Sequence, residues 1–285
     1  MAAFRGASGR RGLGNQAHAK RCNRSFSENA FFSFSGSARN ESAASDPGMA
    51  PAITLMKISA VVCFSALAYI YFPESIDDAY ITLRYARNLI EGHGLVFDVG
   101  QRVEAFSNFT WLCILEVAGW IGLSMPMAMK VLSFLAGLGT LYITACLGRR
   151  IFGQGVAGVL PALLLAVSSF FALWSVDGLE TVFYTMLLTI LLLLLCTGTR
   201  SAMAVGLVAG VVAISRPEAL LFSGIGVLVV LKMRGWREAV KAAAIVMIFA
   251  GGYELFRLIY YHAPVSNAAY LKLKPGWNSV LSGFR

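Results

Sequence analysis

Long apolar runs are the feature that most constrains how this chain can fold. Crossing the hydrocarbon of a membrane as a helix takes about 20 predominantly apolar residues. Five stretches approach or reach that length, namely residues 52–72, 127–147, 155–176, 180–197 and 239–260. Of the 285 residues, 57% are hydrophobic and 14% charged, whereas soluble domains carry about 25% charged residues. The sequence therefore predicts an all-α, polytopic transmembrane helical bundle.

Three shorter apolar runs need separate treatment. Residues 201–214 and 219–232 are separated only by "SRPE", and at ~1.5 Å per helical residue each covers roughly 20 Å. They are predicted to form a tight helical hairpin. The third run, 109–124, is short and carries the acidic Glu116.

The distribution of basic residues decides whether 109–124 crosses the membrane. Seven Lys and Arg residues precede the first span, which places residues 1–51 in the cytoplasm and 73–108 outside by the positive-inside rule. If 109–124 also crossed, Arg149 and Arg150 would lie outside. If it lies in the outer interface, these arginines and the basic cluster at 232–241 all become cytoplasmic. We therefore predict an interfacial helix at 109–124.

This topology gathers the polar turn residues on one side of the membrane. Charged groups at membrane depth are costly and are usually paired or functional, so the convergence predicts a site. Besides the acid pair Asp77 and Asp78, the residues on this side are Glu104, Asn108, Asp177, Glu180, Arg216, Glu218, His262, Asn267 and Lys272.

The acid pair has two interpretations. Residues 76–91 fit an amphipathic helix whose apolar stripe includes Ala79 and Leu83, with Asp77 on the opposite face. A carboxylate here could act as a general base on a sugar hydroxyl. Alternatively, the pair marks only a helix N-terminus, where the helix dipole favours negative charge.

The turns "VDGLET" and "SRPEA" are equally open to a local explanation. Asp177 resembles the cap of the fourth span, with Glu180 in its first turn. Arg216 could bind a phosphate through paired N–H donors, or it could simply form an ion pair with Glu218. Pro217 is suited to starting the returning helix.

Other features of the sequence exclude several classes of function. Residues 1–50 are rich in Ser, Gly, Ala and Arg without helical periodicity, which predicts a disordered segment or an overlong start preceding Met49 or Met56. The net charge of +9 is dispersed at the ends of apolar runs, which argues against nucleic acid as a partner. The five cysteines are scattered and suggest neither disulfides nor a zinc site.

The stretch "DDAYITLRYARNLIEGHGLVFDVGQRVEAFSNFTWL" resembles the first outer loop of the GT-C glycosyltransferases. More narrowly, it resembles the terminal arabinofuranosyltransferases of mycobacterial cell walls and their bacterial relatives. "GLET", "SRPE" and a late Asn-x-x-Tyr-x-Lys follow in the order of that family. The chain departs from the family pattern at Gln101 and Ala105, and at Ser266 and Ala268, which flank Asn267.

The resemblance implies a membrane enzyme that uses a polyprenyl-phosphate sugar donor and a glycan acceptor among membrane lipids. It implies that Asp77 is the catalytic base and that Asp78 assists, with a divalent cation such as Mg²⁺ or Mn²⁺ at this pair as one option. The phosphate would face Arg216 and Lys272. The implied substrate-binding residues are Arg84, Glu104, Ser107, Asn108, Asp177, Glu180, Arg216, Glu218, Asn267 and Lys272.

The expected function is transfer of a sugar, arabinofuranose or another pentose, onto a cell-envelope glycan. Residues 51–285 would form the transmembrane transferase domain, incomplete at its C-terminal side, in the inner or plasma membrane with its active site outside. Three alternatives stay open: transfer of a hexose or mannose to lipid or protein, a transporter or flippase, and an assembly role for a truncated paralogue.

Overall fold

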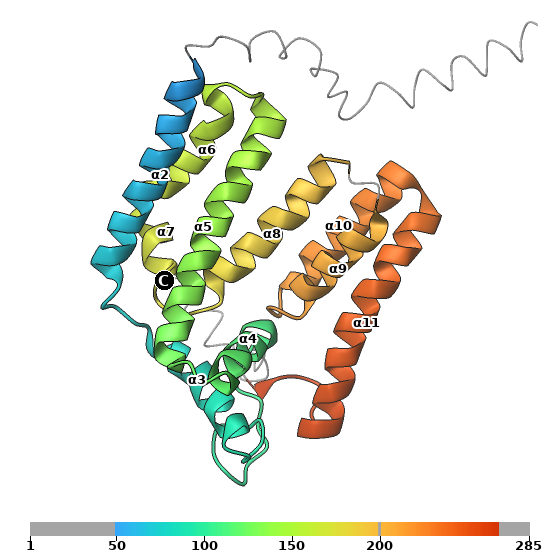
Figure 1. Cartoon of the computed structure of the whole chain (residues 1–285). Helices are drawn as coiled ribbons and strands as arrows, with labels where there is room; N and C mark the ends of the chain where they lie inside the picture. The colour runs from blue at the N-terminus through green and yellow to red at the C-terminus, as the bar shows by residue number, and fades with distance from the viewer. Residues whose placement is uncertain (1–48, 199–200, 268–285) are drawn as a thin grey trace, which may run out of the picture. The chain divides into compact units, whose positions relative to one another are not determined.

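The computed structural model describes residues 49–198 and 201–267. Of the segment 1–50 that is predicted to be disordered, all but residues 49 and 50 therefore lie outside the described residues. The predicted site residue Lys272 also lies outside them. The described chain is helical throughout its regular structure and contains no strand, which confirms the all-α prediction (Figure 1). Its helices are α2 (Met49–Tyr71), α3 (Asp77–Ile90), α4 (Phe109–Trp120), α5 (Met125–Phe152), α6 (Val156–Ala166), α7 (Ser169–Trp174), α8 (Thr181–Cys196), α9 (Ala202–Ala213), α10 (Ala219–Arg234) and α11 (Trp236–Tyr261).

Three of these helices, α2, α5 and α11, are long and apolar enough to cross a membrane. Several shorter helices, such as α8 and α9, are equally apolar. The prediction of an all-α membrane protein is confirmed. Helices α9 and α10 pack against each other as the predicted hairpin, on either side of the turn at 214–218.

The helices pack in two groups that meet at α8. Helix α5 packs against α6 and α8, and α2 covers α6, while α9, α10 and α11 pack together and α9 also contacts α8. Small residues allow close approach, as is common between helices in membranes. A Cβ atom on Gly206 of α9 would lie 3.0 Å from the Cα of Ala242 in α11.

The prediction of one continuous span over 155–176 is wrong. The chain breaks between α6 and α7, where Ser168 is extended and its hydroxyl accepts a hydrogen bond from the backbone N–H of Phe171 at 3.4 Å. This side-chain cap starts a new helix. A serine inside an apolar run thus caps the start of a second helix, where hydropathy alone predicted one helix to continue.

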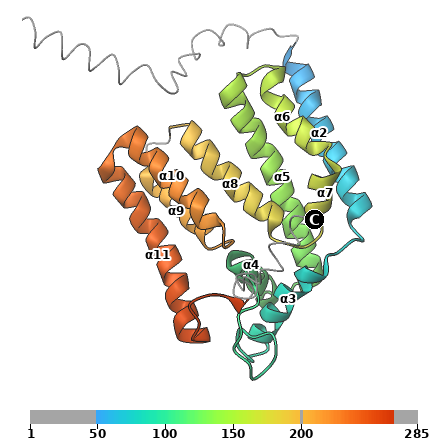
Figure 2. The same cartoon turned by 180° about the vertical axis from the view of Figure 1, so that it is seen from behind.

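Helices α3 and α4 lie together at one end of the longer helices, which we call the α3–α4 end (Figures 1 and 2). The opposite end, which we call the basic end, holds the last turns of α5 and α10 and the start of α11. Its basic residues include Arg149, Arg150, Lys232, Arg234 and Arg237.

The loop between α3 and α4 is fixed to the last turn of α11 by aromatic side chains. The Tyr261 hydroxyl donates to the Leu95 carbonyl at 2.7 Å, and the Leu95 N–H donates to the Tyr260 hydroxyl at 2.9 Å. Tyr85 of α3 donates to the Val103 carbonyl at 2.6 Å. The apolar residues Ala79, Leu83 and Ala86 of α3 are buried in one hydrophobic cluster with Leu95 and Phe106 of this loop.

Candidate functional site

Three loops that are distant in sequence meet in one hydrogen-bonded group, which we call the Glu180 cluster: Thr82, Asn108, Glu180, Arg216 and Glu218. The Asn108 amide donates to Glu180 Oε2 at 2.9 Å and to Thr82 Oγ1 at 3.0 Å. Arg216 donates through Nη1 to Glu180 Oε1 at 2.7 Å and through Nε to Glu218 Oε1 at 2.6 Å. Helix α3 and the starts of α4, α8 and α10 are thereby joined by polar contacts.

The loop that carries Glu180 is pressed between α4 and α5. Trp111 of α4 donates its indole N–H to the Gly178 carbonyl at 3.0 Å, and Ser133 of α5 donates to the Leu179 carbonyl at 3.1 Å. Gly178 has φ +95°, and a Cβ atom there would lie 2.7 Å from the Met129 sulfur. Only glycine fits this turn, so the loop directs Glu180 toward Asn108 and Arg216.

A second group, the Glu104 cluster, comprises Glu104, Tyr253, Glu254 and Arg257. Arg257 of α11 donates through Nε to Glu104 Oε2 at 2.7 Å, and the Tyr253 hydroxyl donates to the other carboxylate oxygen. The Glu104 side chain is 2% exposed and that of Arg257 16%. A buried carboxylate that accepts several donors of this kind is satisfied and held in place.

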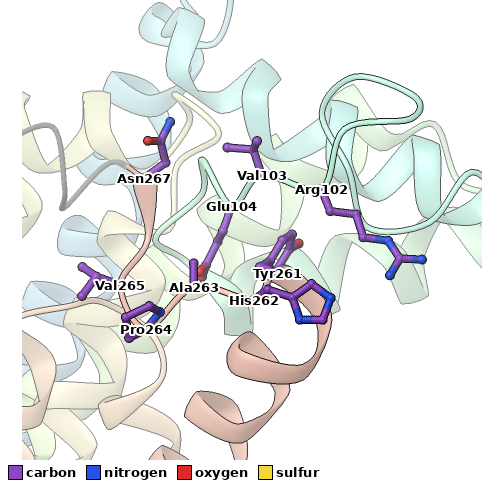
Figure 3. Close-up of a pocket in the computed structure, with 9 residues that line it drawn as sticks. All are labelled: Arg102, Val103, Glu104, Tyr261, His262, Ala263, Pro264, Val265 and Asn267. Carbon is purple, nitrogen blue, oxygen red and sulfur yellow. The ribbon is translucent and has the colours of Figure 1, made fainter.

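Beside the Glu104 cluster lies a cavity of about 580 Å³ between the 102–104 segment and residues 261–267 (Figure 3). The Asn267 N–H donates to the Glu104 carbonyl at 3.0 Å and closes one side. In Figure 3 the side chains of Glu104 and Asn267 point in opposite directions. Neither Asp77 nor Arg216 lines this cavity.

The acid pair lies at the start of α3, as predicted, with Asp77 and Asp78 both exposed in its first turn. In the part of the chain that the structure describes, neither carboxylate forms a hydrogen bond or ion pair. Arg84 is engaged elsewhere: it pairs with Asp98 at 2.6 Å and donates to the Phe97 carbonyl at 2.8 Å. The structure therefore does not join the acid pair or Arg84 to the Glu180 cluster by direct contact.

Asp177 is buried and is not the cap of α8. The helix begins at Thr181, and Glu180 is the residue directly before it. The prediction that Asp177 caps this helix and that Glu180 lies in its first turn is therefore wrong. Asp177 Oδ1 accepts the Leu179 N–H at 2.9 Å, while Oδ2 is buried without a partner. Burial raises the pKa of Asp177 to about 7, and the nearby Glu180 charge acts in the same direction.

Two further predicted residues are placed plainly by the structure. Ser107 is exposed, directly before the buried Asn108. Glu116 of the predicted interfacial helix is partly buried, and desolvation raises its pKa to about 7.

Sequence reasoning left several residues of these groups unassigned: Thr82, Tyr253, Glu254 and Arg257. Glu254 and Arg257 are charged residues near the end of an apolar run, which is itself a signal of pairing or function. Tyr253 and Arg257 are four residues apart and so share a helix face. No comparable signal marks Thr82.

The residues that could hold a divalent cation are few. Among the described residues, no three His, Cys, Asp or Glu side chains gather as a metal site. Mg²⁺ commonly takes only one or two carboxylates together with substrate phosphate oxygens. The exposed carboxylate of either Asp77 or Asp78 could serve as such a single ligand.

The chain is similar in sequence to two curated proteins, each named terminal beta-(1->2)-arabinofuranosyltransferase. The protein from Mycobacterium tuberculosis is 30% identical over 221 residues, covering 69% of this chain and 34% of that protein. The one from Corynebacterium glutamicum is 27% identical over 229 residues, covering 69% of this chain and 32% of that protein. The resemblance that the first outer loop suggested is confirmed.

The chain spans about a third of the length of these relatives. No protein-family model matches it, and no solved structure matches it.

Proposed function

We propose that this chain is a membrane glycosyltransferase that moves a sugar, arabinofuranose, from a polyprenyl-phosphate donor to a glycan of the cell envelope. The Glu180 cluster carries the proposal, because it brings the first loop, the α7–α8 loop and the Arg216 turn together at the end where the acid pair lies. The names of the two relatives support the identity of the sugar. Their greater length makes the activity of this chain a matter for experiment.

In the proposed reaction, the acceptor hydroxyl oxygen attacks the anomeric carbon of the donor sugar. The bond between that carbon and the phosphate oxygen breaks, and the bonding electrons leave with the lipid phosphate. The acceptor proton passes to the Asp77 carboxylate. Asp77 is exposed at the N-terminus of α3 and is thus accessible to an acceptor, and positioned proton transfer of this kind typically accelerates reactions by about 10²–10⁴-fold.

The leaving phosphate needs a cation. Arg216 is the basic residue of the Glu180 cluster, and its side chain is 31% exposed, so part of it is accessible from solvent. A guanidinium matches the spacing of two phosphate oxygens. Lys272, also implied by the resemblance, lies outside the described residues. A divalent cation held by Asp77 and Asp78 would supply further charge stabilisation.

Other predicted residues contribute to binding in less direct ways. Asn108 and Glu180 orient Arg216, and Glu104 fixes the loop beside the cavity that Asn267 closes. This cavity is large enough to admit sugar residues of an acceptor. We further propose that the α3–α4 end faces the periplasm or exterior, where envelope glycans lie.

Asp77→Asn tests the catalytic assignment. We expect transfer of labelled arabinose from polyprenyl-phosphoarabinose to an arabinan oligosaccharide to fall at least about 100-fold, measured on membranes that contain equal amounts of each variant by immunoblot. Glu74→Gln is the matched control, because Glu74 is another exposed acid just before α3. If Asp77→Asn retains activity comparable to that of Glu74→Gln, Asp77 is not the base.

A further inference from the structure

Arg216 is held by two carboxylates that differ in how firmly they are fixed. It reaches Glu180 through Nη1 at 2.7 Å and Glu218 through Nε at 2.6 Å. The Glu180 side chain is 8% exposed, whereas that of Glu218 is 52% exposed. The two contacts use different nitrogens of the guanidinium, so one can change while the other remains.

Glu180 is the fixed partner. Its second carboxylate oxygen accepts from Asn108, whose amide is in turn held by Thr82. Helix α8 also places the Tyr184 ring 5.8 Å from the guanidinium carbon of Arg216. Removing one member of a buried ion pair leaves an uncompensated charge and is strongly unfavourable, so this contact is expected to persist when a ligand binds.

Glu218 is the exchangeable partner. It lies only two residues after Arg216 on the same turn, directly before α10, and its side chain does not cap that helix. Exposed ion pairs contribute little to stability because both charges remain well hydrated. Breaking this contact with Arg216 therefore costs little.

We propose that Glu218 occupies, in the ligand-free protein, the Nε side of Arg216 that a phosphate group takes on binding. This inference rests on the proposed function and adds that Glu218, a side chain of the protein itself, competes with the phosphate for Arg216. Two carboxylates around one guanidinium leave the turn with excess negative charge, which opposes the approach of a phosphate. Displacement of Glu218 removes that opposition and frees N–H donors on the edge of a guanidinium that suits two oxygens at once.

It follows that Glu218 weakens phosphate binding and Glu180 strengthens it, although both are glutamates bonded to the same side chain. If the turn had only a structural role, Glu218 and Glu180 would not be expected to change phosphate affinity in opposite directions. The ligand chemistry is a phosphate group, either at the head of a prenyl lipid or free in solution.

The test is binding of farnesyl phosphate and of inorganic phosphate to the purified chain in detergent, measured by calorimetry. We expect Glu218→Gln to bind farnesyl phosphate about fivefold more tightly than wild type, in line with the strength of an exposed ion pair. Glu180→Gln should bind at least tenfold more weakly, and Arg216→Gln should lose binding. Glu238→Gln is the control, because Glu238 forms an exposed pair with Lys241 at the basic end at 2.6 Å and should leave affinity unchanged.

The outcomes separate this inference from the proposed function. If Arg216→Gln loses binding but Glu218→Gln binds no more tightly than wild type, the exchange is overturned while the phosphate site stands. If Arg216→Gln binds like wild type, both the phosphate site and the exchange fail. A parallel gain with inorganic phosphate assigns recognition to the bare anion, and a gain with farnesyl phosphate alone assigns it to the lipid. The melting temperature of each variant is measured to check its folding. If Glu218→Gln does not fold, Glu218→Ala is used in its place.

Discussion

The charged residues at the two ends of the helices make different kinds of contact. At the α3–α4 end, the principal ion pairs join distant parts of the chain, as in Glu104 with Arg257 and Glu180 with Arg216. At the basic end, the described contacts are local: Arg149 donates to the Ala145 carbonyl one turn earlier, and Lys241 pairs with Glu238 three residues before it.

This difference separates two roles for charge in a membrane protein. Basic side chains at helix ends can anchor the protein at the interface without defined partners. Buried carboxylates need partners, and Glu104 and Glu180 at the α3–α4 end find theirs on other elements. The ion pairs of Glu104 and Glu180 at the α3–α4 end therefore join separate elements, whereas the pair of Glu238 at the basic end lies within one helix.

The largest expected effect concerns the side of the membrane on which each end lies. In a variant whose native cysteines are replaced, Ser107→Cys at the α3–α4 end should react fully with a membrane-impermeant maleimide on intact cells. Met233→Cys at the basic end, which is 56% exposed in the wild type, should react only after lysis. The opposite pattern would remove the proposed outward-facing site.

The next effect concerns the ion pairs themselves. Arg257→Leu leaves the buried Glu104 carboxylate without its main partner and should lower the free energy of unfolding by about 3–5 kcal/mol, measured by denaturant titration in detergent. Glu238→Gln, which breaks the exposed local pair, should change it by at most about 0.5 kcal/mol. Equal losses in the two variants would show that the two ends do not differ in this way.

A third effect, smaller per pH unit than the loss expected for Arg257→Leu, should appear in the pH dependence of stability. The pKa of Asp177 is raised to about 7 in the folded protein from about 3.9 in an unfolded chain. The native state then binds more protons between these values, so the stability contributed by Asp177 falls as pH rises from about 4 to 7, by at most about 1.4 kcal/mol per pH unit.

Asp177→Asn should remove this part of the slope, as measured by thermal unfolding at several pH values. Glu116, whose pKa is also raised to about 7, contributes the same slope to wild type and variant, so the difference between them reports Asp177. Identical pH profiles for the two proteins would contradict a raised pKa of the buried Asp177.

Much of the fold could be predicted from the sequence. Apolar run length identified the long helices, the period of 76–91 identified α3 and its buried stripe, and "SRPE" identified the hairpin of α9 and α10. The break at Ser168 could not be predicted in this way. A single hydroxyl changes mean hydropathy little, yet it decides where backbone N–H groups find an acceptor.

The candidate site was predicted as a set of residues but not as a set of contacts. Asn108, Glu180, Arg216 and Glu218 lie in one hydrogen-bonded group, in which Arg216 forms the pair with Glu218 that the local interpretation predicted. Glu104 lies near Asn267. Arg84 is instead committed to Asp98. Spacing along the chain predicts that two side chains share a helix face. It does not predict with which of several nearby acids an arginine forms an ion pair.

The sequence by itself determined that this protein is a membrane helical bundle with polar residues concentrated at particular turns, because hydropathy and helical period act over short stretches. Only the tertiary structure decided that Glu180 is shared by Asn108 and Arg216, that Glu104 is held by Arg257, and that Asp177 is buried without a full set of partners. Each of these contacts spans at least 36 residues or depends on burial. Such relations arise from how the helices pack, and no local pattern encodes them.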